Sequence, residues 1–145
     1  METGQDRGAV MSTYQWNERY SVNIQALDRQ HQGLFRTLNE LSDALSSGQG
    51  GTVVEDVLRK LLDYTASHFA AEEKLMDLHR FPGLASHRLK HQELTKRVIS
   101  LREEYRAGNV GVPVSLMLFL QSWLKEHILV ADKQYSAFLN AKGVQ

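Results

Sequence analysis

Cysteine is absent from this chain of 145 residues. Its absence excludes disulfides, thiolate catalysis, cysteine-based zinc sites and iron–sulfur clusters. A charge excess is missing too, because 17 basic residues balance 17 acidic ones and the pI is close to 7.0. Nucleic acid and anionic membranes attract basic surfaces, so the composition gives no indication of either partner.

Long hydrophobic runs are also lacking. The longest apolar stretch, residues 112–120, is interrupted by Pro113 and Ser115, and a bilayer-spanning helix needs about 20 apolar residues. Residues 1–13 are polar and contain glycine, without the apolar centre of a secretory signal. We interpret them as a flexible leader and expect a cytoplasmic protein that does not bind membranes.

Apolar residues between positions 24 and 45 recur at spacings of three and four, which predicts an amphipathic helix. Similar patterns predict helices over about 53–78 and 84–105, and a fourth from Pro113 to about Asn140. Breaks rich in glycine or proline separate these segments. We therefore predict an all-α fold, an antiparallel up-down-up-down four-helix bundle over residues 14–141. Trp16 and Tyr20 are expected to anchor an N-terminal arm on it.

Histidine is the residue type that points to a function. Five of the six histidines and two carboxylates come from all four predicted helices, and at about 1.5 Å per residue most of them converge roughly 10–15 Å from one pole of the bundle. These candidate metal ligands are His31, His68, Glu72, His87, His91, His127 and Asp132. The sixth histidine, His79, has no partner four residues away, and we interpret it as a solvated turn residue.

A spacing of four residues places two side chains on one helix face, as in the pairs of the second and third helices. His127 and Asp132 are five residues apart. Either a π-bulge aligns them, or the two side chains enter the bundle from different sides. Glu73 lies five residues after His68, so spacing alone does not exclude it in favour of Glu72.

Imidazole and carboxylate ligands together suit iron, zinc, nickel or copper. Seven ligands exceed the needs of one such ion and indicate two metals that share the carboxylates. In a pair of six-coordinate irons, five histidines, two bridging carboxylates and a solvent bridge leave one position open, on the iron with fewer histidines. That vacancy suits a diatomic ligand. The chain has no Glu-x-x-His motif, and a histidine-rich site is expected to bind oxygen reversibly more readily than to cleave it.

Several segments of the chain resemble the hemerythrin family, in particular its bacterial single-domain members, the bacteriohemerythrins. The resemblance extends from Trp16 to about Phe138. It is carried by YSVNI at 20–24 with DRQH at 28–31, by HFAAEE at 68–73, by FP at 81–82 with two histidines at 87 and 91, and by WLKEH at 123–127 with Asp132.

This resemblance implies a non-haem di-iron centre of two iron ions (Fe2+/Fe3+) with a bridging oxo or hydroxo group and O2 as the ligand. It assigns three histidines to the saturated iron, two to the iron that binds oxygen, and two carboxylates as bridges, which favours Glu72 over Glu73. The ligands of the saturated iron are His87, His91 and His127. Those of the oxygen-binding iron are His31 and His68, and the bridges are Glu72 and Asp132. The resemblance also assigns Leu34, Phe69, Trp123 and Leu124 to an apolar oxygen pocket.

The function expected from this resemblance is reversible O2 binding, for storage or for delivery to an oxygen-consuming enzyme. We expect a monomer with no catalytic residue. Three alternatives stay open: oxygen sensing through a separate partner; oxidase, peroxidase or nitric oxide chemistry at the same centre; and a bundle that holds zinc or stores iron.

Overall fold

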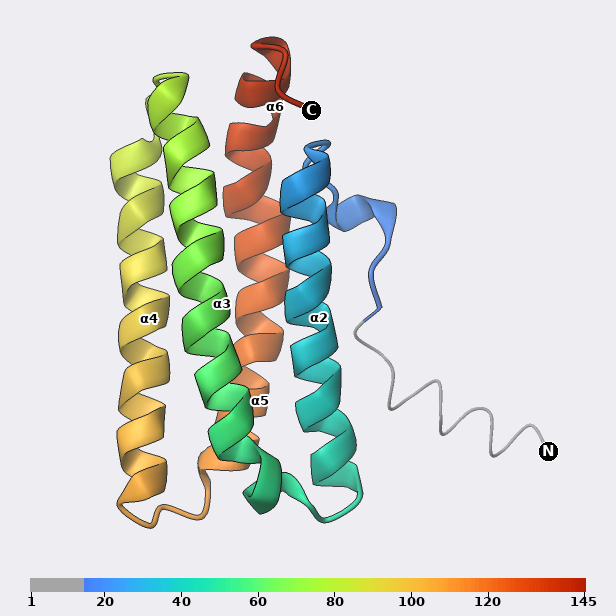
Figure 1. Ribbon diagram of the computed structural model, residues 1–145, viewed down its shortest axis with the longest axis vertical. Helices are drawn as coiled ribbons and strands as arrows, with labels where there is room; N and C mark the ends of the chain where they lie inside the picture. Colours follow the sequence, from blue (N-terminus) through green and yellow to red (C-terminus); the bar gives the residue numbers. More distant parts are fainter. Residues whose placement is uncertain (1–14) are drawn as a thin grey trace, which may run out of the picture.

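Four helical rods run alternately up and down the molecule in the computed structural model, which describes residues 15–145 (Figure 1). The first three rods are single helices, and the fourth consists of three consecutive helical segments. In chain order they are α2 (Gln25–Ser46), α3 (Gly50–Leu78), α4 (Leu84–Arg106), and α5 (Val112–Trp123) followed by η2 (Leu124–Asp132) and α6 (Lys133–Ala141). The predicted all-α bundle is confirmed. The predicted leader, 1–13, lies outside the described residues.

The breaks between the rods come from residues that do not continue a helix. Gly48 and Gly108 adopt positive φ angles of 78° and 99° just after α2 and α4, a conformation that glycine adopts without steric cost. Pro113 occupies the first turn of α5, where its missing N–H removes no helical hydrogen bond. The rods begin and end within a few residues of the predicted positions.

The interior contains two apolar clusters, one on either side of a polar layer. Along α2, Leu27 belongs to the smaller cluster and Leu34 to the larger one, and His31 lies between them. The same order recurs along α3, where Glu72 lies between Phe69 of the larger cluster and Met76 of the smaller one. The layer is thereby shielded from water along the bundle axis in both directions.

The N-terminal arm packs on the outside of α2 through aromatic side chains. The ring of Trp16 lies 5.8 Å from that of Tyr20 and 5.7 Å from that of Phe35, which confirms the predicted anchor. The arm includes one turn of 3-10 helix, η1 (Glu18–Tyr20). Asp28 in the first turn of α2 fixes the end of the arm by accepting a hydrogen bond from the Val22 backbone N–H at 2.8 Å.

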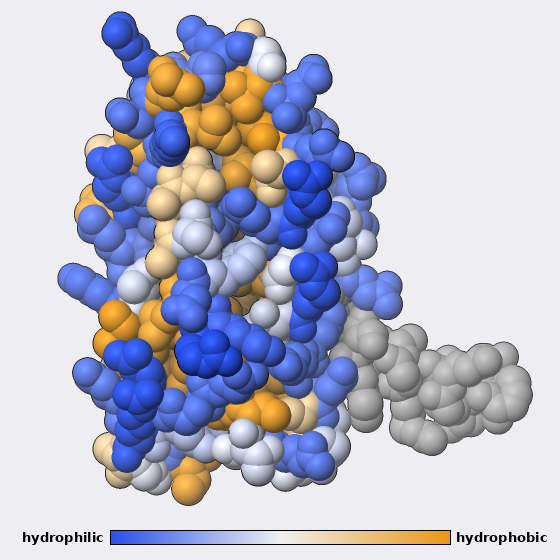
Figure 2. Space-filling view, in the orientation of Figure 1, coloured by the Kyte–Doolittle hydropathy of each residue, from blue (hydrophilic) through white to orange (hydrophobic). Residues whose placement is uncertain are grey.

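The fourth rod, Val112–Ala141, is the one helix within residues 15–145 that is long and apolar enough to cross a membrane by length and composition. It packs instead as a member of the bundle, and 39% of its most apolar window is buried there. On the face shown in Figure 2, hydrophilic side chains cover most of the surface, with one apolar patch near the pole where α3 and α6 end and smaller apolar groups toward the opposite pole.

Candidate metal centre

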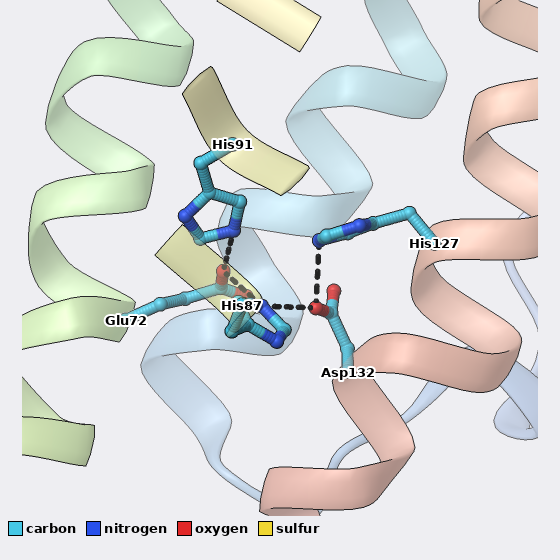
Figure 3. A group of neighbouring side chains, drawn as sticks. All are labelled: Glu72, His87, His91, His127 and Asp132. Atoms are coloured by element: carbon cyan, nitrogen blue, oxygen red, sulfur yellow. Dashed lines mark ion pairs between the residues drawn. The ribbon is translucent and has the colours of Figure 1, made fainter. Parts of the chain in front are cut away.

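Seven side chains from the four rods meet in the polar layer, and they are the seven that the sequence singled out. Each of the seven is at most 5% exposed. Figure 3 shows five of them pointing toward one another from α3, α4 and η2. The set comprises His31 from α2, His68 and Glu72 from α3, His87 and His91 from α4, and His127 and Asp132 from η2. His79 is the residue that caps the end of α3 and is not part of the cluster.

A π-helical segment brings His127 and Asp132 to the same face of the fourth rod. The whole of η2, Leu124–Asp132, is π-helical, a winding in which backbone hydrogen bonds join residues five apart. The Nε2 atom of His127 lies 3.0 Å from Oδ1 of Asp132. Of the two alternatives that the spacing allowed, the structure therefore shows the π geometry.

Glu72 contacts histidines from both parts of the cluster. Its Oε2 atom lies 3.1 Å from the Nε2 atoms of His31 and His68. Its other oxygen, Oε1, lies 3.0 Å from Nε2 of His91. One carboxylate thus presents one oxygen to each of two groups of imidazoles.

Asp132 repeats this arrangement from the opposite rod. Its Oδ1 atom lies 3.0 Å from the Nε2 atoms of His87 and His127, and Oδ2 lies 3.1 Å from Nε2 of His31. The imidazoles therefore divide into a group of three, on α4 and η2, and a group of two, on α2 and α3. Both carboxylates lie between the two groups, as shared ligands of two metals would.

Several inward-facing atoms of this layer lack a hydrogen-bond partner among the described residues. They are Oε1 of Glu72, both carboxylate oxygens of Asp132, and the Nε2 atoms of His87, His91 and His127. Their mutual contacts have ion-pair distances without hydrogen-bond geometry. A buried polar atom without a partner costs about 1–3 kcal/mol. Metal ions would satisfy all of these atoms, so the donor set fits two cations with nitrogen and oxygen ligands.

The electrostatics of the layer call for positive charge between the carboxylates. Burial alone would lower the pKa of His31, but its contacts with Asp132 and Glu72 outweigh burial and raise that pKa to about 10. The same balance raises the pKa of His87 to about 9. Burial would raise the pKa values of both carboxyls, yet the surrounding imidazoles hold them well below their usual range. The raised pKa values favour protonated imidazoles in the metal-free cluster, and metal ions would displace those protons.

Two imidazoles are supported from behind by polar side chains. The Nδ1–H of His68 donates to Oε1 of Gln30 at 2.5 Å, and the Nδ1–H of His91 donates to Oε2 of Glu73 at 2.7 Å. Such bonds fix the ring and direct Nε2 toward a metal. Glu73 is thus a supporting residue outside the ligand cluster. No pattern in the sequence distinguishes Gln30 from the other polar residues of α2.

Tyr135 holds one of the shared carboxylates, and the sequence analysis missed it. Its O–H donates to Oε2 of Glu72 at 2.5 Å. Burial first, and then the neighbouring carboxylate, raise the pKa of the phenol well above its usual value, so it stays a donor. Tyr135 lies three residues after Asp132 and thus on nearly the same helix face, which is the signal that could have identified it.

The four predicted pocket residues divide between two places. Leu34, Trp123 and Leu124 line a small cavity of about 10 Å³ beside the polar layer, together with other mostly apolar side chains. Phe69 instead stacks on His91, with ring centroids 3.7 Å apart and 3° between the planes. Trp123 also stacks on a candidate ligand, so aromatic rings cover part of the cluster.

An up-down-up-down helical bundle with a buried, histidine-rich cluster for two cations defines a class of metal-binding bundle proteins. Comparison with known proteins identifies one family within that class. The model of the "Hemerythrin HHE cation binding domain" matches residues 22–139. The chain belongs to the hemerythrin family.

Known members of the hemerythrin family are similar to this chain over most of their length. The bacteriohemerythrin of Stenotrophomonas maltophilia is 35% identical over 87% of this chain and 81% of its own. Myohemerythrin-1 of Phascolopsis gouldii is 28% identical over 90% of this chain and 98% of its own. A crystal structure of a leucine-to-alanine variant of hemerythrin superposes with a TM-score of 0.78 at 28% identity, covering 86% of this chain and 95% of that one. Membership of this family and the ligand cluster together point to a di-iron centre.

Proposed function

We propose that this chain binds O2 reversibly at a non-haem di-iron centre formed by the seven clustered residues. One iron would be held by the imidazoles of α4 and η2 and the other by those of α2 and α3, with the two carboxylates shared. The first iron would be held by His87, His91 and His127, and the second by His31 and His68. The shared carboxylates would be those of Glu72 and Asp132. When bound, the iron pair supplies the electrons that reversible oxygen binding requires.

The unequal division of the imidazoles is the observation that carries this proposal. Three imidazoles lie on one side of the shared carboxylates and two on the other. With equal shares of the carboxylates, the side with two imidazoles keeps room for an external ligand. Because the seven side chains are at most 5% exposed, a small diatomic molecule suits this position better than a larger ligand.

The surroundings of the cluster favour binding over net chemistry. The cavity of about 10 Å³ beside the polar layer is lined by Leu34, Leu124 and other mostly apolar side chains. Leu34 lies three residues after His31, which places it one helical turn from the half with two imidazoles. An apolar lining excludes water and proton donors, and their exclusion slows irreversible oxidation. Reversible binding of this kind suits storage or delivery of oxygen by a cytoplasmic monomer.

The test is metal analysis with visible absorption of the anaerobically reduced protein, before and after air is admitted and again after oxygen is removed. Two irons per chain and an absorption band that appears with air and fades reversibly would support the proposal. A permanent ferric spectrum with steady consumption of reductant would indicate oxidase chemistry, and zinc or a single ion per chain would contradict the di-iron centre. His68→Ala should abolish the reversible band, whereas His79→Ala, a change outside the cluster, should preserve it.

A further inference from the structure

The two halves of the cluster are supported by side chains of different charge. Behind the half with three imidazoles, the Nδ1–H of His91 donates to Oε2 of Glu73 at 2.7 Å. The other oxygen of Glu73 accepts a hydrogen bond from Nε of Arg88 at 3.0 Å. Arg88 lies on α4, one turn before His91, so this ion pair fixes the carboxylate against the imidazole. The Glu73 side chain is 21% exposed and therefore partly shielded from water.

Among the described residues, no such carboxylate lies behind the half with two imidazoles. The Nδ1–H of His68 donates to the neutral amide oxygen of Gln30 at 2.5 Å. The Nδ1 atom of His31 is buried and has no hydrogen-bond partner among residues 15–145. The support on this side therefore orients one ring and adds no negative charge.

A hydrogen bond from Nδ1–H to a carboxylate increases the electron density that the imidazole offers through Nε2. A neutral amide accepts the same hydrogen bond with less effect, because it carries no net charge. Both contacts lie largely out of water, where electrostatic effects are stronger than in solution. The two halves should thus differ in their affinity for a divalent cation.

We propose that Glu73, fixed by Arg88, makes the half with His87, His91 and His127 the tighter metal position, and that the neutral Gln30 leaves the other half the weaker one. This inference rests on the ligand set of the proposed function. It adds an order of occupancy, in which the tighter half fills first and empties last, and it assigns part of that order to two positioning residues outside the ligand set.

Ligand number favours the same order, because with both carboxylates shared one position has five candidate ligands and the other has four. The test must therefore change the supporting charge and leave the ligands in place. Glu73→Gln does so, since an amide oxygen can still accept from His91. Gln30→Glu is the reverse change on the other half. Matched controls are Glu103→Gln near the far end of α4 and Gln25→Glu at the start of α2, both on exposed residues.

The experiment is withdrawal of Co2+ from the loaded full-length protein by a competing chelator, followed by the visible spectrum of the bound cobalt. The unaltered protein should lose its two ions in separate steps. Glu73→Gln should weaken the tighter step on the order of 10-fold, the lower end of what loss of such a contact costs, and bring the steps together. Gln30→Glu should bring them together by tightening the weaker step. Both controls should keep the original separation.

Loss of both ions in one step from the unaltered protein would overturn the inference, as would a Glu73→Gln protein whose tighter step changes less than twofold. Equal weakening of both steps would contradict it as well, because that result indicates a general structural effect. The oxygen-binding proposal is tested separately on the iron protein. Separate cobalt steps without reversible oxygen binding would refute that proposal and leave the order of occupancy standing only as a property of the metal sites.

Discussion

Tyr135→Phe removes a single oxygen atom from the most buried part of the polar layer. The phenol is fully buried among the smaller apolar cluster, and its O–H donates to Oε2 of Glu72 at 2.5 Å. Phenylalanine keeps the ring and its packing. The substitution therefore isolates the hydrogen bond between a neutral donor and a buried charged carboxylate.

The magnitude follows from what Glu72 retains. A hydrogen bond to a charged group contributes about 1.5–3 kcal/mol to stability. In the unaltered protein Oε2 also lies 3.1 Å from the Nε2 atoms of His31 and His68, and these contacts do not involve Tyr135, so the carboxylate is not left without partners. We expect the free energy of unfolding of the metal-free protein to fall by about 2 kcal/mol, or about 4–8 °C in the midpoint of thermal unfolding.

The assay is denaturant unfolding of the metal-free protein, with Tyr105→Phe as the matched control. The Tyr105 O–H donates to the neutral backbone oxygen of Gly51 at 2.5 Å in an exposed position. Its loss should cost about 0.5–1 kcal/mol. If Tyr135→Phe costs no more than Tyr105→Phe, the reasoning that the buried carboxylate depends on this donor is refuted.

Three further changes test other parts of the structure. Leu124→Ala enlarges the cavity beside the polar layer and should cost about 2–5 kcal/mol of stability; in the iron protein it should also speed oxygen release and autoxidation in stopped-flow measurements. The metal-free protein should lose stability between about pH 6.5 and pH 10, because His31 and His87, with folded pKa values of about 10 and about 9, bind protons more tightly than in the unfolded chain; denaturant midpoints that do not change over this range would contradict the expectation. Asp28→Asn weakens the contact with the Ser21 hydroxyl and should increase hydrogen exchange in the arm by loosening it, with an effect of about 1–2 kcal/mol.

The helices were predictable because their apolar period and their breaks agree. Between residues 24 and 45 the apolar positions form one face, and the structure places that face in the core. Gly48 and Pro113 mark chain reversals for reasons of backbone geometry that hold in any context. Where local preference and burial pattern indicate the same structure, the sequence is sufficient.

The π segment shows where this agreement ends. His127 and Asp132 are five residues apart, a spacing that excludes a shared face in a regular α-helix but is compatible with two solutions. Neither proline nor glycine occurs between Leu124 and Asp132, so no residue in the segment predicts the change from α- to π-helix. The π-helical winding is explained only by the polar layer, because it lets the side chains of both His127 and Asp132 reach the same cluster.

The candidate ligands and their supports differ in predictability for a related reason. Histidine and carboxylate residues are few among the buried positions of a helical bundle, so seven of them at one level are a strong pattern. Supporting residues such as Gln30 and Glu73 belong to the many partly buried polar residues inside the helices, and their role depends on which way each side chain turns. The sequence does yield the number of ligands in each half of the cluster, and this number alone distinguishes the two halves. The difference in charge behind His68 and His91 acts on the same two positions through the basicity of ligands already in place, and only the three-dimensional structure reveals it.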